Sequence, residues 1–446
     1  MPSVRRGVYF APVTVPRASA RASLSLRKGP PGPVLSDREG HSILPIRAPL
    51  RSLAHRNFRI YFAAQAASVF GTWIQQVAMS WLVYRLTGSV ELLGLTTFCA
   101  LIPQLVLSPV AGAWSDRVDR LRALILIESL LFLQALLLAL LAWLGAPGPA
   151  LLIALSALLG ILNSFEGPLR QSLLSRLVPG REDLSNAIAL NAMLYNVGRL
   201  TAPPLAGLAL LVTSEAACFA FNAASFLAMI AGLLVLRIPP EPRLERPLAH
   251  VFREGLHHAF TSPATRVLLL VLVVCNLTAS SYTVLLPVFA REVFAGDSRT
   301  LGLLWGAAGG GSLLAAFHLA THRTERRTQS GIFLGMASSA VALLVFPLTT
   351  HLPLAMCAMV ALGFGITSTN VGCNITLQTA APDAMRGRVI AFFSSTRWGF
   401  DALGGLLAGF VASRIGAPRT VLVEGAVLLV GGSLLATRRH RLRGGS

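Results

Sequence analysis

Charged side chains are concentrated in one short stretch of a chain that is otherwise largely apolar. The segment GAWSDRVDRLR, from Gly112 to Arg122, lies between two long apolar runs. Carboxylates such as Asp116 accept hydrogen bonds from the amides at a helix N-terminus, and arginines such as Arg120 pair with acids on neighbouring helices. The chemistry that this segment offers is therefore ionic fastening between helices. The alternative is a solvated turn, which we favour for Arg122.

Polar side chains also recur at helical spacing in three apolar stretches. Steps of three and four residues place each set on one helix face, and such a face is expected to point away from lipid. The sets are Gln65, Ser68, Thr72, Gln75 and Gln76; Asn276, Ser280 and Thr283; and Thr367, Asn370, Asn374 and Gln378. Two interpretations remain open, the lining of a cavity or hydrogen bonding between helices. With Trp73, Tyr282 and Phe364 nearby, a cavity would suit an amphipathic, partly aromatic ligand.

Ionisable residues inside apolar stretches are costly and often functional. Arg199 and Asp401 are both near the middle of such stretches, and Arg397 precedes Asp401 by one helical turn. An ion pair between Arg397 and Asp401 within one helix is therefore expected.

The elements that position these groups are membrane helices. The chain has 446 residues, 54% hydrophobic and 13% charged, whereas soluble domains are about one quarter charged. Runs of about 20 apolar residues predict an all-α membrane protein with twelve transmembrane helices. The predicted spans are 58–83, 91–114, 122–144, 150–174, 185–212, 215–236, 266–290, 299–321, 329–348, 352–380, 386–413 and 418–437.

The positive charge indicates the orientation. The formal net charge is +19, but the arginines form short clusters between apolar runs instead of one patch, which argues against nucleic-acid binding. With the N-terminus inside, twenty arginines, Arg170 among them, fall in the inner loops and the C-terminal tail, and five in outer loops. Both termini are therefore expected in the cytoplasm. Lys28 is the only lysine, which we interpret as codon bias in a GC-rich bacterial genome. The expected location is the bacterial inner membrane.

The predicted spans divide into two pseudo-symmetric six-helix bundles, 51–236 and 266–437. Residues 237–265, rich in Pro, Arg and Glu, are expected to form a central cytoplasmic loop. Residues 1–50 and 438–446 are expected to be cytoplasmic tails, the first disordered. A weak repeat at an offset of 202 supports the division, since Leu-Ala-Gly recurs at 205–207 and 407–409 and Arg199 aligns with Asp401. Parallel repeats of this kind are one transporter architecture.

No residue set suggests an enzyme, a metal or a cofactor. The five cysteines all fall in apolar runs without a C-x-x-C, and the histidines lack an H-E-x-x-H arrangement. The absence of G-x-x-x-x-G-K-[ST] argues against ATP as the direct energy source.

The pattern G-x-x-x-D-R-x-D-R-x-R between predicted spans two and three resembles the loop signature of the major facilitator superfamily. The matching residues are Gly112, Asp116, Arg117, Asp119, Arg120 and Arg122. The resemblance implies a conformational latch in which Asp116 meets the N-terminus of span eleven. It also implies that Arg120 pairs with an acid on span four, for which Glu166 is the candidate, and that spans one, four, seven and ten line the cavity. Span four would contribute Asn163 and Glu166.

A second motif, NVGRLTAPPLAG, resembles the Gly-Pro signature of antiporter branches of that superfamily, with Gly198, Pro203 and Gly207 in place and Ala202 where a glycine is usual. The alternative is a packing and kinking element. Together with LRSLAHRNFRIYF and FNAASFLAMI, the chain is most similar to the enterobactin-exporter and macrolide-efflux branch.

These resemblances imply a secondary active transporter that works by alternating access, with proton-coupled efflux of small amphipathic compounds as the leading version. Asp401 and Glu166 are equal candidates for carrying the proton, and the alternative for both is a structural ion pair. Rival functions are uptake or lipid movement by the same fold, and a scaffold that does not transport. The expected partners are a small-molecule substrate, protons and the lipid bilayer, and the chain is expected to be a monomer.

Asp116→Asn tests the latch. The substitution removes the charge that the helix N-terminus attracts but keeps the size of the side chain. We expect membrane insertion to be unchanged and most transport to be lost, as measured by substrate flux in vesicles with matched protein content. Transport at the wild-type rate would contradict the latch.

Overall fold

The chain is almost entirely helical where the structure describes it. The computed structural model describes residues 50–115, 117–145, 148–238, 263–321, 325–380 and 386–437. The predicted N-terminal tail before residue 50, most of the predicted loop 237–265, the tail 438–446 and Asp116 lie outside these residues.

We call the helices α1–α6 the first half of the chain. After a short 3-10 turn, η1 (Arg51–Ala54), come α1 (Arg56–Thr87), α2 (Val90–Ser115), α3 (Arg120–Trp143), α4 (Pro149–Leu174), α5 (Arg181–Val212) and α6 (Glu215–Val235). Each of these six helices lies within a few residues of a predicted span.

The second half runs from α8 to α14. It contains α8 (Pro263–Thr278), α9 (Tyr282–Val288), a π-helical turn η2 (Phe289–Val293), α10 (Ser298–Thr321), α11 (Glu325–Val345), η3 (Phe346–Leu348), α12 (Leu352–Ala380), α13 (Arg386–Ile415) and α14 (Ala417–Thr437).

Nine helical segments of the described chain are long and apolar enough to cross a membrane: α2, α3, α4, α6, the stretch Thr265–Val293, α10, α11, α12 and α14. Three other helices match predicted spans but carry more polar and charged residues. These are α1 and α5, of 32 residues each, and α13, of 30 residues. The prediction of a multi-pass, all-α membrane protein is confirmed.

The seventh predicted span is not one continuous helix, and the expectation that Asn276, Ser280 and Thr283 share a helix face was wrong. The chain leaves the helix between α8 and α9. The Ser281 hydroxyl donates to the Thr278 carbonyl at 2.7 Å and the Thr283 hydroxyl to the Ser280 carbonyl at 3.1 Å. Pro287 within α9 has no N–H to give to the preceding turn. Side-chain donors therefore satisfy carbonyls that an unbroken helix would have satisfied.

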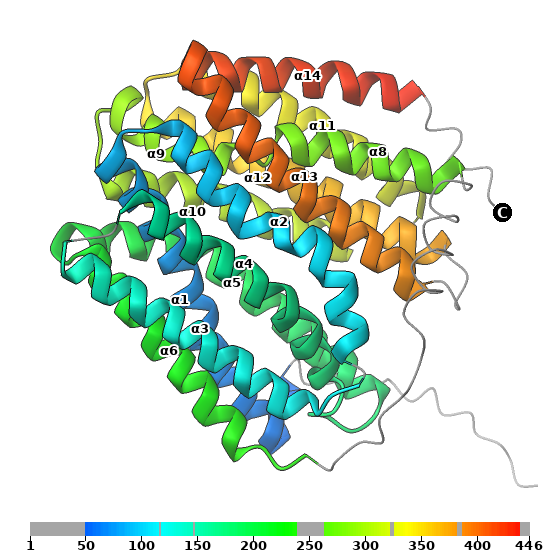
Figure 1. Ribbon diagram of the computed structural model, residues 1–446. Coiled ribbons are helices and arrows are strands. Elements are labelled where there is room, and N and C mark those ends of the chain that lie inside the picture. Colours follow the sequence, from blue (N-terminus) through cyan, green and yellow to red (C-terminus); the bar gives the residue numbers. More distant parts are fainter. Residues whose placement is uncertain are drawn as a thin grey trace, which may run out of the picture. The chain divides into compact units, whose positions relative to one another are not determined.

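Two pairs of helices make most of the contact between the halves. α2 packs along α13, and α5 packs along α10 (Figure 1). Within the first half α1 and α3 both pack against α6, and α2 against α4, while in the second half α12 packs against α10 and α11.

Glycines let both inter-half pairs approach to backbone contact, and they do so symmetrically. A Cβ placed on Gly409 of α13 would lie 3.0 Å from the Cα of Gly94 on α2. A Cβ placed on Gly207 of α5 would lie 3.1 Å from the Cα of Gly302 on α10. Gly207 and Gly409 end the two Leu-Ala-Gly repeats, so the repeated sequence makes equivalent helix crossings.

Polar contacts join the halves at the same end of the molecule. We call this end the outer face, where α1 meets α2 at residues 87–90, and the opposite end, with residues 115–120 and 174–181, the inner face. At the outer face the Ser413 hydroxyl donates to Glu91 at 2.6 Å, and Tyr84 hydrogen-bonds to Glu292. The Ser298 hydroxyl donates to the Gly207 carbonyl at 3.0 Å.

Gly94→Leu tests the importance of the glycine crossing. A Cβ at this position would lie 2.8 Å from the Gly405 carbonyl oxygen, so a larger side chain must push α2 from α13. We expect a loss of about 1–3 kcal/mol of stability, measured by thermal unfolding of the detergent-purified protein. Gly331→Leu on α11 is the control, because no described atom lies within 4 Å of its Cβ position. If Gly94→Leu and Gly331→Leu were equally stable, the glycine crossing would not be important for stability.

Candidate functional site

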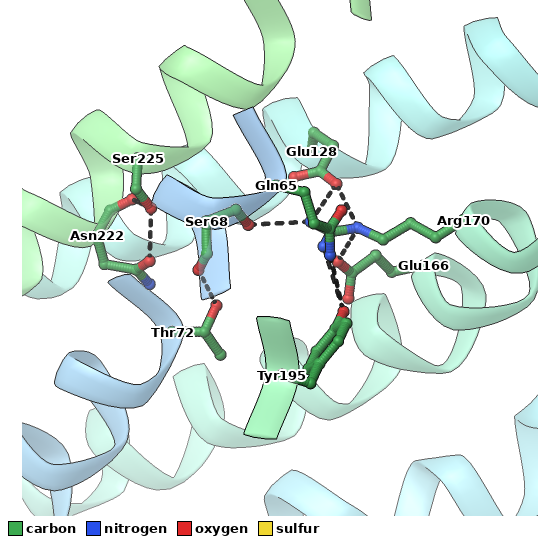
Figure 2. A network of polar contacts seen from close by, with 9 residues as sticks. All are labelled: Gln65, Ser68, Thr72, Glu128, Glu166, Arg170, Tyr195, Asn222 and Ser225. Carbon is green, nitrogen blue, oxygen red and sulfur yellow. Dashed lines mark hydrogen bonds and ion pairs between the residues drawn. The ribbon is translucent and has the colours of Figure 1, made fainter. Parts of the chain in front are cut away.

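A buried charged cluster in the first half is centred on Arg170. The sequence assigned Arg170 to an inner loop, and this was wrong: the residue lies in the last turns of α4, and its side chain is only 8% exposed. Its partners are Glu128 on α3 and Glu166 one turn earlier on α4 (Figure 2). The helical spacing from Glu166 to Arg170 and the contact of α3 with α4 bring all three groups together.

The guanidinium of Arg170 donates to groups on four helices. Nη2 donates to Glu128 Oε1 at 2.8 Å and to the Ser68 hydroxyl on α1 at 3.0 Å. Nε lies 2.6 Å from Glu166 Oε1, and Nη1 lies 3.5 Å from the Tyr195 hydroxyl on α5. Gln65 of α1 also donates from Nε2 to the Tyr195 hydroxyl, at 2.9 Å. Such charge-assisted hydrogen bonds offset part of the cost of burying the ions.

A cavity of about 450 Å³ adjoins this cluster. Its polar lining includes Gln65, Glu166 and Arg170, together with Asn191. Its apolar and aromatic lining comes from Tyr61, Tyr195, Leu174, Leu184 and Ile188. Leu174 ends α4 and Leu184 is in the first turn of α5, so the cavity extends toward the inner face. A pocket with an apolar wall and a few convergent polar groups is typical of small-molecule sites.

The polar residues along one face of α1 have two different roles. Some line the cavity, and others form hydrogen bonds between helices. Gln65 lines the cavity and Ser68 binds Arg170. Gln75 is buried and instead joins Asn222 of α6, at 2.8 Å, and Gln134 of α3, at 3.4 Å. It therefore serves helix packing. Thr72 and Gln76 are exposed, and Asn163 of α4 is half-buried.

The polar stripes of the second half form pairs across and along helices. Asn276 of α8 and Asn370 of α12 are both buried, and each donates to the other's side-chain oxygen, at 3.1 and 3.3 Å. Gln378 donates to Asn374 at 2.9 Å along α12. Thr367 is buried and Thr283 half-buried. The Asn276–Asn370 pair supports the hydrogen-bonding interpretation for these two residues.

Aromatic rings from both halves meet at Trp305 of α10. Trp73 of α1 lies 6.1 Å from it, edge to face, and Tyr282 of α9 lies 6.4 Å from it. Phe364 contacts His318 at 5.9 Å. Two of the three predicted aromatic residues are therefore close together at the boundary of the two halves.

Asp401 is within reach of groups from both halves. It can accept a hydrogen bond from Ser280, between α8 and α9, and it lies within electrostatic range of Arg397 on its own helix and of Arg199 on α5. Arg397 places its guanidinium 4.6 Å from the Trp398 ring centre. The structure thus gathers three of the predicted charged residues, and their role remains a prediction.

The described part of the predicted latch is at the inner face. Asp119 caps α3, because its Oδ1 accepts from the backbone N–H groups of Leu121 and Arg122 at 3.1 Å. Arg120 Nε lies 3.4 Å from the Ser115 carbonyl, and Arg117 is exposed. No described atom lies within 4 Å of the Cβ position of Gly112. The expected pairing of Arg120 with Glu166 remains a prediction; Glu166 is paired with Arg170.

The antiporter-like motif is placed between α5 and its neighbours. A Cβ on Gly198 would lie 2.6 Å from Val69 on α1, and a Cβ on Gly302 would lie 2.6 Å from the Pro203 carbonyl oxygen. Gly207 makes the crossing with α10. These contacts support the packing interpretation of the motif.

Four residues of the cluster and the adjoining cavity were absent from the predicted site: Arg170, Glu128, Tyr195 and Tyr61. Glu128 is fully buried, two turns into an apolar helix, and Arg170 follows Glu166 by one helical turn. Both positions were visible in the sequence as charges at membrane depth. Their mutual proximity was not, because it depends on how α3 and α4 pack.

Comparisons with known proteins concern the chain as a whole. A family model described as "Transmembrane secretion effector" matches residues 47–445. The chain is 27% identical over 375 residues to the "Staphyloferrin A transporter" of Staphylococcus aureus. The aligned region covers 82% of this chain and 92% of that protein. It is 27% identical over 397 residues to the "Multidrug efflux pump Tap" of Mycolicibacterium fortuitum, covering 86% and 95%.

A third relative, the "Enterobactin exporter EntS" of Shigella boydii, is 26% identical over 387 residues, 85% of this chain and 91% of that protein. Among solved structures, a bacterial homologue of the human lysosomal transporter Spinster superposes with a TM-score of 0.66 at 14% identity, covering 87% of this chain and 98% of that one. The similarity in structure supports the fold. The predicted resemblance to the enterobactin-exporter branch is confirmed.

Arg170→Met tests the energetics of the cluster. The variant keeps most of the side-chain volume but leaves two carboxylates facing each other without a cation, and we expect a loss of about 3–5 kcal/mol of stability. Adding Glu128→Gln should recover a large part of that loss, because one buried charge is removed. Thermal unfolding of the purified single and double variants measures both effects. If the double variant were less stable than Arg170→Met by the loss that Glu128→Gln causes alone, the energetic coupling of Glu128 to Arg170 would be contradicted.

Proposed function

We propose that the chain, which belongs to the transmembrane secretion effector family of major facilitator transporters, exports small amphipathic compounds by alternating access in exchange for protons. Its family and the relatives described above are transporters. The relatives named as an efflux pump and an enterobactin exporter favour export over uptake.

The observation that carries the proposal is the cavity beside Arg170. It extends toward the inner face and combines an apolar wall with the buried ionic cluster. The helices of the two halves contact each other at the outer face through Gly94–Gly409 and Gly207–Gly302. A site with access from the inside and a seal on the outside is the state in which an exporter takes up its substrate.

The opposite state requires the contacts at the two faces to exchange. Opening outward would separate α2 from α13 and α5 from α10 at their outer ends and would break the Glu91–Ser413 hydrogen bond. The inner ends would then close, and Gly112, Asp116 and Arg120 would fasten α2 to α13. Asp119 and Arg120 of the motif lie at the inner face, where such a latch would act.

Proton coupling is assigned to the Glu128–Glu166 pair. The guanidinium of Arg170 neutralises only one of the two carboxylates. When both are ionised, the cluster therefore has one negative charge without a matching cation. A buried excess charge is costly, and binding a proton removes the cost. Asp401 stays a second candidate, but it faces two arginines and one serine.

The membrane arrangement completes the proposal. α1, α5 and α13 would span the bilayer together with the nine apolar segments, to give twelve spans in two pseudo-symmetric six-helix bundles. The arginine clusters at the inner face support a cytoplasmic position for both termini in a bacterial cell. The chain would work as a monomer in the inner membrane.

Transport across a pH gradient tests the function. In proteoliposomes containing the purified protein, substrate flux should release protons into, or take protons from, the lumen in proportion to transport. Glu166→Gln should abolish most of the proton-coupled flux, because a glutamine amide cannot take up and release the proton. A fluorescent dye of the efflux type and a luminal pH indicator provide the two readouts.

Asp297→Asn is the matched control. It removes one carboxylate charge at the outer end of α10 but retains an N-cap residue, since Asp297 accepts from Arg299 and Thr300 amides and Asn can do so as well. We expect this variant to transport at the wild-type rate. Flux that is independent of the pH gradient in the wild type would favour a passive, lipid-moving facilitator; no flux of any tested compound would favour a scaffold.

A further inference from the structure

We propose that the cavity beside Arg170 selects monocationic amines that carry an aromatic or aliphatic body, and discriminates against anions. The inference rests on the proposed function, because it names the class of substrate that this cavity would take.

Some hydrogen-bond acceptors at the cavity have no partner among the described residues. Arg170, the main donor, is already directed at Glu128, Glu166, Ser68 and Tyr195. Among the described residues, no hydrogen-bond partner reaches two buried side-chain oxygens of the lining, Gln65 Oε1 and Asn191 Oδ1, and none reaches Glu128 Oε2 behind Arg170. Buried acceptors without donors are costly. A ligand with several N–H groups would satisfy them, and an ammonium group has three.

The net charge points to the same ligand. Glu128 and Glu166 bring two negative charges and Arg170 one positive charge, so the ionised cluster has a net charge of −1. Glu166 lines the cavity directly, whereas Glu128 is fully buried behind Arg170. A ligand cation beside Glu166 would neutralise the cluster, whereas an anion there would be repelled by the one uncompensated negative charge in a medium of low dielectric.

Other charged groups do not reverse this preference. Arg199 is one helical turn beyond Tyr195 on α5, and with Arg397 and Asp401 it belongs to a group of net charge +1 that is not among the described residues lining the cavity. The described arginine that lines the cavity is Arg170 itself, whose charge is already counted.

The remaining wall suits the body of such an amine. Leu174, Leu184 and Ile188 offer aliphatic surface, and Tyr61 and Tyr195 offer ring faces. Ring faces attract cations within about 6 Å of the ring centre. An ammonium group near Glu166 could therefore contact acceptors on one side and rings on the other, with its apolar body against α5.

Three probes of one shape and different charge test the inference. 1-Naphthylmethylammonium, 1-naphthylmethanol and 1-naphthoate share a ring system and carry a positive, no and a negative charge at pH 7. Equilibrium dialysis against the detergent-purified full chain measures their affinities. We expect the ammonium probe to bind at least about tenfold more tightly than the alcohol, because its contacts with the carboxylate are charge-assisted. The naphthoate should bind more weakly than the alcohol.

Variants locate the preference. Glu166→Gln makes the cluster neutral, so the ammonium probe should lose its advantage over the alcohol while the affinity for the alcohol changes little. Glu128→Gln removes the same charge from behind Arg170 and should give the same result. Asp297→Asn, outside the cavity, should leave the wild-type order intact.

The order of the probes decides the outcome even if a variant fails to fold. Naphthoate binding to the wild type as tightly as the ammonium probe, or no measurable binding of the ammonium probe, overturns the inference. An ammonium preference that survives Glu166→Gln and Glu128→Gln places it at another site and also overturns it.

Flux of the same probes in proteoliposomes separates this inference from the proposed function. Selective binding of the ammonium probe without any flux would leave the ligand class standing and remove the transporter proposal. Proton-coupled flux of the naphthoate, without ammonium binding, would keep the transporter and remove the cationic substrate.

Discussion

The close approach of backbones at four glycines determines how the halves of this protein meet. In lipid there is little hydrophobic gain from pressing helices together, so contact depends on packing and on polar groups. Gly94 with Gly409, and Gly207 with Gly302, allow α2 to reach α13 and α5 to reach α10 without intervening side chains. Both crossings are toward the outer face, where Glu91 and Ser413 also bind. With the halves joined at that end, the cavity beside Arg170 extends toward the other.

Burial of charge is the second constraint, and it explains why the cluster takes its form. A lone guanidinium at the depth of Arg170 would be strongly unfavourable, and the structure compensates it with two carboxylates, a serine and a tyrosine drawn from four helices. Compensation is incomplete, since one carboxylate charge is in excess. A fully neutral cluster would be more stable but would have no reason to bind a proton or a cationic ligand. The excess charge thus connects the energetic cost of the site with the proposed transport activity.

Polar residues at similar positions on one helix have different tasks. Gln65 and Gln75 are both on α1 and both buried, and the sequence placed them in one stripe. Gln75 is bound to Gln134 and Asn222 and holds α1 to its neighbours, whereas Gln65 lines the cavity and reaches Tyr195. Helical periodicity could not separate them, because it reports which residues share a face and not which neighbour covers that face. The same holds for Asn276, whose partner Asn370 is far away in sequence.

The sequence by itself determined the class of protein, the bounds of nearly all helices and the family, because apolar length, arginine clusters and the Gly112–Arg122 motif are local signals. It also revealed the Leu-Ala-Gly repeat, which the structure places at equivalent crossings. Only the tertiary structure decided that the seventh span is broken at Ser280, where the hydroxyls of Ser281 and Thr283 donate to backbone carbonyls. It alone brought Glu128 to Arg170, since partners 42 residues apart on separate helices are chosen by packing and by the cost of an unpaired charge in a medium that lacks water.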